Sequence, residues 1–292
     1  MNTKQGYMIC VWLLYGLICC TVSSGRGTSG VFDDDYYVTW APDHVTRLNA
    51  AREVHIALDR RSGAGFASKK AYLFGKFEMQ IKLPPGNSAG TVVAYYLYSN
   101  QPNRDEIDIE FLGNVEGTKY IMQTNIFSNG YGNREQRIHL WFDPTARFHT
   151  YTVLWTRFYI LFVVDGIPIR AHKNNAGLGI PYPRRQPMSL YASIWNGEDW
   201  ATNGGKTKIS WRRNGAFVAE FRELKMDACA WNGNPRFCKA STPLNWWNQR
   251  KYAFLTPTQT SRLAWVRKYF LLYDYCNDKS RGIPTLECSH RL

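Results

Sequence analysis

The chain has 292 residues and a hydrophobic content of 45%, which suits one large all-β domain or two smaller domains. The full chain carries a formal net charge of +13, but its Lys and Arg residues are scattered along the sequence, which argues against nucleic acid as a partner. Beyond the N-terminal stretch no segment is apolar for long enough to cross a bilayer, so we expect no membrane association after that stretch is removed.

The first 25 residues have the pattern of a secretory signal peptide. Lys4 precedes an apolar stretch, Tyr7–Thr21, and small residues follow at 23–25. A membrane anchor is the alternative, but the apolar stretch is short for a span. We therefore predict a signal peptide over 1–25, secretion, and a basic mature protein that favours contact with an acidic extracellular matrix.

Short strand-like runs separated by turn residues occupy the region 26–225. Dipeptides such as Asn129-Gly130 and Asp165-Gly166 are typical of tight hairpin turns. Many short strands with regular turn signals predict an all-β fold, a sandwich or jelly roll of antiparallel sheets. The expected strands include the runs 55–59, 72–83, 92–98, 105–111, 151–155, 159–166 and 188–195.

Residues 105–113, Asp-Glu-Ile-Asp-Ile-Glu-Phe-Leu-Gly, alternate acidic with apolar side chains. Period-two alternation predicts a β-strand with one buried face. Three carboxylates then share the other face while three apolar side chains enter the core: Glu106, Asp108 and Glu110 against Ile107, Ile109 and Phe111.

A row of like charges destabilises the strand that carries it, so we expect it to serve a function. On a regular strand the Cα atoms of Glu106 and Glu110 lie about 13 Å apart. On a curved strand, two long side chains can bring their carboxyls to about 5–5.5 Å, the separation used by retaining glycosidases. The alternative is the acidic, solvated face of an ordinary edge strand.

Four cysteines follow the signal region, and all lie in the last quarter of the chain. An even number in a secreted chain predicts two disulfides, and local pairing is the simplest of three arrangements. A zinc site is the competing interpretation, which the long gaps between cysteines and the oxidising setting disfavour. The local pairs are Cys229 with Cys238 and Cys276 with Cys288.

The C-terminal quarter also contains the one convincing helix. Thr260 or Ser261 is the expected N-cap, and Leu263, Val266 and Phe270 form a partial apolar stripe. We predict a small extension, 226–292, packed on the sandwich domain of residues 26–225.

The acidic strand and several further blocks together resemble the xyloglucan endotransglucosylase/hydrolases of plant cell walls, in glycoside hydrolase family 16. The resemblance covers essentially the whole mature chain, and its strength lies in the order of the blocks. The matching blocks are 72–76, 85–91, 105–113, 123–125, 132–136, 140–145, 162–170, 195–205, 265–268 and 275–288.

The resemblance implies a curved, concanavalin-like jelly roll of two antiparallel sheets with a long cleft on its concave face. It implies that Glu106 is the nucleophile, that Glu110 is the general acid/base and that Asp108 is a helper. It also implies local pairing of the cysteines and a C-terminal extension that lengthens the acceptor side of the cleft. This chemistry uses no metal and no organic cofactor.

Carried over position by position, the resemblance implies a sugar-binding set. Amides and charges suit sugar hydroxyls, and indole faces suit apolar sugar rings. Taken singly, Asn133 could instead serve turn chemistry, Trp195 could be core, and Trp200 and Arg281 could make ordinary surface contacts. The implied set is Glu110, Gln123, Thr124, Asn125, Asn133, Arg134, Glu135, Trp195, Asp199, Trp200, Gly204 and Arg281.

The sequence departs from the family pattern at three places. Arg104 stands where the family commonly has His before the acidic strand, and Ala67 replaces a frequent Gln. The glycosylation sequon that many members carry after the catalytic strand is missing, since Asn114-Val115-Glu116 lacks the hydroxyl residue. These departures leave the acidic strand intact.

The resemblance implies double displacement on the β-1,4-glucan backbone of xyloglucan, with transfer to another xyloglucan chain or oligosaccharide. We expect a secreted monomer that acts in the cell wall or apoplast. One alternative is a mainly hydrolytic endo-glucanase on xyloglucan or mixed-linkage glucan. Another is a non-catalytic lectin, because sandwich lectins share this architecture.

Overall fold

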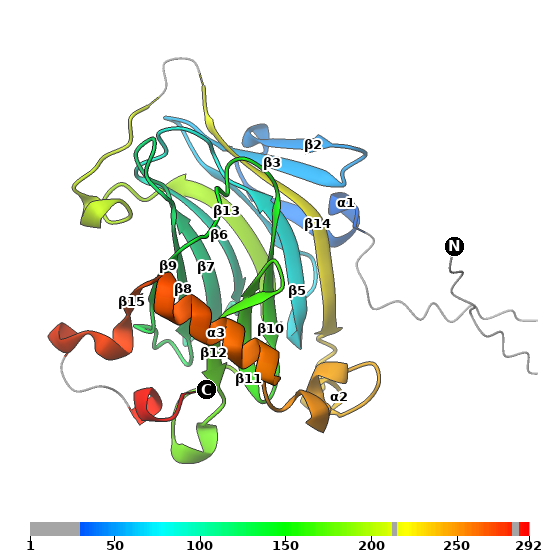
Figure 1. Ribbon diagram of the computed structural model, residues 1–292. Helices are drawn as coiled ribbons and strands as arrows, with labels where there is room; N and C mark the ends of the chain where they lie inside the picture. The colour runs from blue at the N-terminus through cyan, green and yellow to red at the C-terminus, as the bar shows by residue number, and fades with distance from the viewer. Residues whose placement is uncertain (1–29, 212–214, 282–285, 292) are drawn as a thin grey trace, which may run out of the picture.

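The computed structural model describes residues 30–211, 215–281 and 286–291 (Figure 1). Two antiparallel sheets of eight and seven strands lie face to face, and their long strands curve together. This arrangement confirms the predicted jelly roll. The predicted signal peptide, 1–25, lies outside the described residues.

The eight-stranded sheet contains the acidic strand near its middle. Its neighbours are hydrogen-bonded in an order that interleaves distant parts of the chain. In spatial order the strands are β1 (Tyr36–Trp40), β4 (Ala64–Ser68), β13 (Ser189–Asn196), β6 (Thr91–Tyr98), β7 (Glu106–Leu112), β8 (Ile121–Phe127), β9 (Gln136–His139) and β15 (Leu271–Asp274).

The seven-stranded sheet covers the inner face of the first sheet. It is built around two long strands, one of 11 and one of 14 residues. In spatial order the strands are β12 (Ile167–Lys173), β11 (Tyr159–Val164), β10 (His149–Trp155), β5 (Tyr72–Lys82), β14 (Phe217–Ala230), β3 (Glu53–Leu58) and β2 (Val45–Leu48).

The space between the sheets is filled by the apolar halves of alternating strands. Ile107, Ile109 and Phe111 of β7 are fully buried there, as the alternation predicts. The Phe111 ring meets Tyr151 of β10 edge-on, with centroids 4.7 Å apart, so it joins the two sheets. Each such side chain contributes about 1.5–3 kcal/mol by burial. The acidic face of β7 is therefore fixed from below by a dense core.

Helices are few in the described residues. The α-helices are α1 (Phe32–Asp35), α2 (Pro235–Lys239) and α3 (Pro257–Tyr269). Short 3-10 turns occur at Pro42–His44, Ala176–Leu178, Asn203–Gly205, Trp246–Asn248, Arg250–Tyr252, Tyr275–Asn277, Lys279–Arg281 and Leu286–Ser289. No helix among these residues is both long and apolar enough to cross a membrane.

The start of α3 corrects one prediction. The helix begins at Pro257, and its N-cap is Thr256 rather than Thr260 or Ser261. Thr256 accepts a hydrogen bond from the Gln259 backbone N–H, and the Gln259 side chain accepts one from the Thr256 backbone N–H. This reciprocal capping box satisfies two free donors, and Pro257 sits where a helix needs no N–H.

The C-terminal extension is tied into the sandwich at both ends. The boundary predicted at 225/226 falls inside β14, which runs unbroken from Phe217 to Ala230. Strand β15 pairs with β9 and so becomes an edge of the eight-stranded sheet. α3 packs across β12, in orange at the front of Figure 1. The disulfides join Cys229 to Cys238 and Cys276 to Cys288, the expected pairing.

Candidate active site

The acidic face of β7 is continued by its two neighbouring strands. In register, Glu106 lies opposite Tyr98 of β6 and Phe127 of β8. Asp108 lies opposite Tyr96 and Asn125, and Glu110 lies opposite Ala94 and Gln123. Because opposite residues in a sheet point to the same side, these nine side chains form one outward-facing patch.

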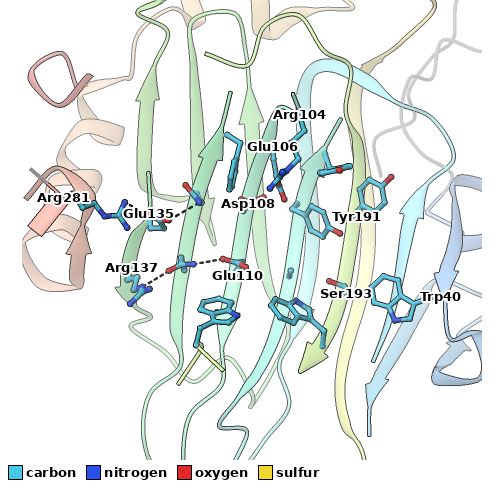
Figure 2. Close-up of a pocket in the computed structure, with 18 residues that line it drawn as sticks. Trp40, Arg104, Glu106, Asp108, Glu110, Glu135, Arg137, Tyr191, Ser193 and Arg281 are labelled. Carbon is cyan, nitrogen blue, oxygen red and sulfur yellow. Dashed lines mark hydrogen bonds and ion pairs between the residues drawn. The ribbon is translucent and has the colours of Figure 1, made fainter. Parts of the chain in front are cut away.

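This patch is the floor of a groove of about 770 Å³, which we call the carboxylate groove (Figure 2). It is open to solvent, and all three carboxylates of β7 line it. Its walls come from both halves of the eight-stranded sheet and from the C-terminal extension. The lining residues are Trp40, Ala94, Tyr96, Tyr98, Arg104, Glu106, Asp108, Glu110, Gln123, Asn125, Phe127, Glu135, Arg137, Tyr191, Ser193, Trp195, Trp200 and Arg281.

Glu106 is paired with a cation. The Nε of Arg104 donates to its Oε2 at 2.6 Å. The Arg104 guanidinium also lies 4.7 Å from the ring centroid of Phe127 and 6.0 Å from that of Tyr98. The two aromatic residues that flank Glu106 in register therefore also hold its counter-ion.

Glu110 is oriented by a chain of two hydrogen bonds. The Nε2 of Gln123 donates to its Oε2 at 2.7 Å, and the Oε1 of Gln123 accepts from the Nε of Arg137 at 2.7 Å. Arg137 fixes which way the amide faces, because a guanidinium can only donate. Burial raises the pKa of Glu110, and the hydrogen bond from Gln123 partly opposes that rise.

Asp108 sits between the two glutamates and is the most enclosed of the three acids. Burial, with Glu106 and Glu110 on either side, holds the pKa of Asp108 well above its usual range. A neutral Asp108 can donate a hydrogen bond to the neighbouring Glu106 carboxylate. One strand thus presents a carboxyl paired with a cation beside two carboxyls, Asp108 and Glu110, whose pKa is raised.

The C-terminal extension contributes to one wall of the groove. Arg281 forms an ion pair with Glu135, with Nη1 2.8 Å from Oε2, and donates a hydrogen bond to the Asn133 carbonyl at 2.9 Å. The other oxygen of Glu135 accepts a long hydrogen bond, 3.5 Å, from the amide of Asn125. A connected row of polar groups therefore runs from the extension to the middle of the floor (Figure 2).

Aromatic side chains line the floor and opposite wall. Trp195 and Trp200 have ring centroids 5.9 Å apart, and Tyr96 stacks on Tyr191 at 5.2 Å. Trp40 lies across Gly65, where any Cβ would come within 2.2 Å of the indole ring. Such faces suit the apolar sides of sugar rings, whereas the row of amides and charges suits their hydroxyls.

Nine of the residues predicted from the sequence come together in this groove. They are Glu106, Asp108, Glu110, Gln123, Asn125, Glu135, Trp195, Trp200 and Arg281.

The remaining predicted residues lie outside the lining. Thr124 faces the core and accepts a hydrogen bond from buried Arg170 at 2.9 Å. Arg134 is buried in an ion pair with Glu287 at 2.8 Å. The other three lie outside the strands: Asn133 has φ 62°, the Asp199 side chain is 91% exposed and pairs with Lys208, and Gly204 has φ 63° in the 3-10 turn Asn203–Gly205.

The groove also contains residues that sequence reasoning missed. Tyr96 and Tyr98 share a face in a predicted strand, so period-two alternation marked them as a pair. Their presence on the same sheet face as the carboxylates depends on the register between β6 and β7, and the sequence pattern does not predict that register. Arg137, Tyr191 and Trp40 carried no local signal. Ala67, by contrast, is fully buried and lies outside the groove lining.

Within the part of the chain that the structure describes, the three groove carboxylates do not form a cluster close enough to share one metal ion. Within the described residues, the His, Cys, Asp and Glu side chains that come close enough to share one ion are Glu53, His55 and Glu220. They lie on β3 and β14 of the other sheet. There Glu53 accepts from Asn49 at 3.1 Å and Glu220 from Lys82 at 2.9 Å.

Comparison with known families divides the chain into two matched parts. The model described as glycosyl hydrolases family 16 matches residues 32–213. The model described as the xyloglucan endo-transglycosylase C-terminus matches residues 241–288.

Similar curated proteins extend over most of the chain. The probable xyloglucan endotransglucosylase/hydrolase protein 10 of Arabidopsis thaliana is 54% identical over 264 residues, covering 90% of this chain and 88% of the relative. The xyloglucan endotransglucosylase protein 34 of Populus tremula x Populus tremuloides is 49% identical over 250 residues, covering 86% and 84%.

Solved structures share the sandwich. A Bacillus licheniformis β-glucanase matches with a TM-score of 0.52 and 25% identity, covering 69% of this chain and 90% of that one. The Crh5 transglycosylase matches with a TM-score of 0.52 and 26% identity, covering 69% and 80%.

Proposed function

This chain belongs to the xyloglucan endotransglucosylase/hydrolases of glycosyl hydrolase family 16, and on that basis we propose that it cuts the β-1,4-glucan backbone of xyloglucan and rejoins the fragment to another xyloglucan chain. The observation that carries the proposal is the row of three carboxylates on the floor of an open groove with aromatic walls. The product keeps the anomeric configuration of the donor.

In the first half-reaction, Glu106 attacks the anomeric carbon while Glu110 protonates the departing glycosidic oxygen. A covalent glycosyl ester on Glu106 results. The assignment of roles follows from the contacts. Glu106 is held beside the guanidinium of Arg104, which serves as its counter-ion, whereas burial raises the pKa of Glu110, as suits a general acid. Asp108 donates its proton in a hydrogen bond to Glu106 and steadies the nucleophile.

In the second half-reaction Glu110 acts as a base. It takes the proton of an incoming hydroxyl, whose oxygen attacks the anomeric carbon and releases Glu106. A 4-hydroxyl from another glucan chain gives transfer, and water gives hydrolysis. Aromatic and polar groups that hold an acceptor chain raise its local concentration over the reacting carbon, which favours transfer. The scheme requires no metal and no organic cofactor.

The sugar-binding roles divide by location. Gln123, Asn125, Glu135 and Arg281 hydrogen-bond hydroxyls, and Trp195 and Trp200 stack on sugar rings; all line the groove. Thr124, Asn133, Arg134, Asp199 and Gly204 support these contacts from behind or from the rim. Arg134 is the clearest case, because its backbone N–H donates to the Asn125 side-chain oxygen at 3.0 Å and so turns that amide.

The proposed setting is the plant cell wall. Family membership, a leader-like N-terminus and the wall polymer named for the relatives support secretion to the apoplast. The active form in this proposal is a monomer. Donor and acceptor are both xyloglucan, the acceptor being a polymer or an oligosaccharide.

The test uses mature protein, xyloglucan polymer and a labelled xyloglucan oligosaccharide. Movement of label into polymer is the expected result, and Glu106→Ala should abolish it while leaving polymer binding intact. Steady shortening of polymer without incorporation would replace transfer by hydrolysis as the function. Unchanged turnover in Glu106→Ala would refute the catalytic assignment, and binding without turnover in the wild type would indicate a lectin.

A further inference from the structure

The contact between Arg104 and Glu106 has a consequence for the balance of the two half-reactions. The Arg104 guanidinium is held by three groups at once: Glu106 at 2.6 Å and the rings of Phe127 and Tyr98. Side-chain exposure is 38% for Arg104 and 16% for Glu106, so the pair is only partly screened by water. The cation is therefore a fixed part of the nucleophile's surroundings.

The charge of Glu106 changes twice in the proposed cycle. It begins as a carboxylate, becomes a neutral ester when its oxygen bonds to the anomeric carbon, and returns to a carboxylate when that bond breaks. A fixed cation at hydrogen-bond distance stabilises the carboxylate and gains little from the ester. Its presence therefore opposes ester formation and assists ester breakdown.

We propose that Arg104 is a positioning residue that shortens the lifetime of the glycosyl-enzyme by favouring the free carboxylate of Glu106. This inference rests on the proposed role of Glu106 as nucleophile. A partly exposed ion pair shifts an equilibrium by about fivefold. Arg104 should therefore alter the ratio of the two half-reaction rate constants by about that factor, without being required for either.

The experiment is burst kinetics on the mature protein with an aryl glycoside of a xyloglucan oligosaccharide. The burst rate reports ester formation, and the later steady rate with excess acceptor reports ester breakdown. In Arg104→Gln the first should rise and the second should fall, changing their ratio about fivefold. Arg104→Lys keeps a cation at the site and should stay near the wild-type ratio. Lys119→Gln removes an exposed cation elsewhere and serves as the matched control.

Two results would overturn the role of Arg104. A fall of both rate constants by a common factor in Arg104→Gln would mean that the residue only maintains structure. An unchanged ratio would mean that the cation does not act on the ester. Failure of the proposed function looks different, since an active Glu106→Ala variant, or a product of inverted anomeric configuration, would remove the nucleophile itself.

A second inference comes from the positive charge of the C-terminal extension. Xyloglucan is a neutral polymer, so the proposed reaction does not explain this charge. Between residues 228 and 273 the sequence has seven Lys or Arg and no Asp or Glu. Arg250, Lys251 and Lys268 are exposed in this stretch and form no ion pair with another described residue. This stretch of the C-terminal extension therefore contributes cations to the surface and no acidic side chain of its own.

This surface contains an apolar groove of about 540 Å³, which we call the extension groove. It lies between α3 and the loop before it. Phe254 lines one side of it and is 74% exposed, so most of this large apolar side chain is open to solvent. Its lining residues are Phe254, Leu255, Thr260, Leu263, Ala264, Arg267 and Lys268.

We infer that the extension groove binds a polysaccharide whose sugars carry carboxylates. The charge complementarity is direct, because Arg267 and Lys268 lie in the groove and Lys251 lies just before Phe254. An exposed ring beside cations suits an acidic sugar, whose ring face is apolar and whose carboxylate binds Lys or Arg. Such binding would hold the enzyme near its neutral substrate through a separate polymer.

The test measures retention of mature protein on polygalacturonate, with Lys251→Glu/Lys268→Glu compared against Lys70→Glu/Lys119→Glu. Both double variants change the net charge equally, and all four lysines are exposed. We expect the first pair to lose about tenfold in affinity and the second pair much less. Phe254→Ala should weaken the binding that remains in high salt. Label transfer to xyloglucan should be unchanged in every variant.

Equal losses in the two double variants would overturn the site, because they would show attraction by net charge alone. Equal binding of fully methyl-esterified polygalacturonate would overturn the acidic ligand. Tighter binding of a single-stranded oligonucleotide than of polygalacturonate would also overturn it, in favour of general polyanion binding.

Discussion

Replacing Gln123 by Met should move the alkaline limb of the pH profile upward. The Gln123 amide donates to Glu110 at 2.7 Å, and that hydrogen bond stabilises the charged form of Glu110. Met has a similar length but cannot donate. The pKa of Glu110, which burial already raises, should therefore rise further in the variant.

The size of the shift follows from the contact. A hydrogen bond to a charged group contributes about 1.5–3 kcal/mol, and the partial exposure of Glu110 places this one near the lower value. Since 1.36 kcal/mol corresponds to one pKa unit, we expect a shift of about one unit. Glu110 must be protonated to act as the acid, so kcat/KM should persist to higher pH.

The assay is the pH dependence of kcat/KM for transfer, which reports the free enzyme. The test compares the position of the alkaline limb along the pH axis. The height of the profile is not compared, because Gln123 also contacts sugar in the proposal. Gln80→Met is the matched control, since Gln80 accepts from Arg222 at 2.8 Å on the other sheet. An alkaline limb that stays in place or moves downward in Gln123→Met would refute the reasoning.

Three further predictions follow from described contacts. Arg134→Met leaves Glu287 buried without its partner, which should cost about 3–5 kcal/mol of unfolding free energy in urea titration; a loss below 1 kcal/mol would contradict a buried ion pair. Thr256→Ala removes the cap of α3 and should cost about 1 kcal/mol, measured by the same titration; Thr258→Ala inside the helix should cost nothing, because Ala is the better helix former, and an equal loss there would exclude the cap as the cause. Trp195→Ala should raise KM about tenfold with a smaller effect on kcat if the indole stacks on substrate, corresponding to about 1.4 kcal/mol; an unchanged KM would exclude that role.

The face of the acidic strand could be predicted because strand alternation is local. Six consecutive residues suffice to separate Glu106, Asp108 and Glu110 from the apolar side chains between them, and the core confirms the separation. The same rule applied to Gln123-Thr124-Asn125 divides that block, since Thr124 must point opposite to its neighbours. In the structure Thr124 does point into the core, where its hydroxyl accepts a hydrogen bond from Arg170.

Other features depend on pairing between distant strands. Tyr191 reaches the groove because β13 pairs with β6, nearly 100 residues earlier in the chain, and Arg137 reaches Gln123 because β9 pairs with β8. No local pattern specifies such a register. The cap of α3 is a different case, because the capping box of Thr256 and Gln259 can be recognised from the sequence alone. The prediction placed the N-cap too late because it followed the apolar stripe of the helix.

The pairing of β15 with β9 bears on how chains of this kind can be recombined. The tail supplies the last strand of the sheet that carries the carboxylates, and Arg281 from the same tail braces Glu135. A chimera that exchanges tails between relatives would thus transplant part of the pocket wall with its hydrogen-bonding partners. Truncation before residue 271 would expose β9 as an edge strand whose free backbone N–H and C=O groups could pair with another molecule. The tail is consequently a structural part of the carboxylate groove, and engineering of acceptor choice can begin with its residues.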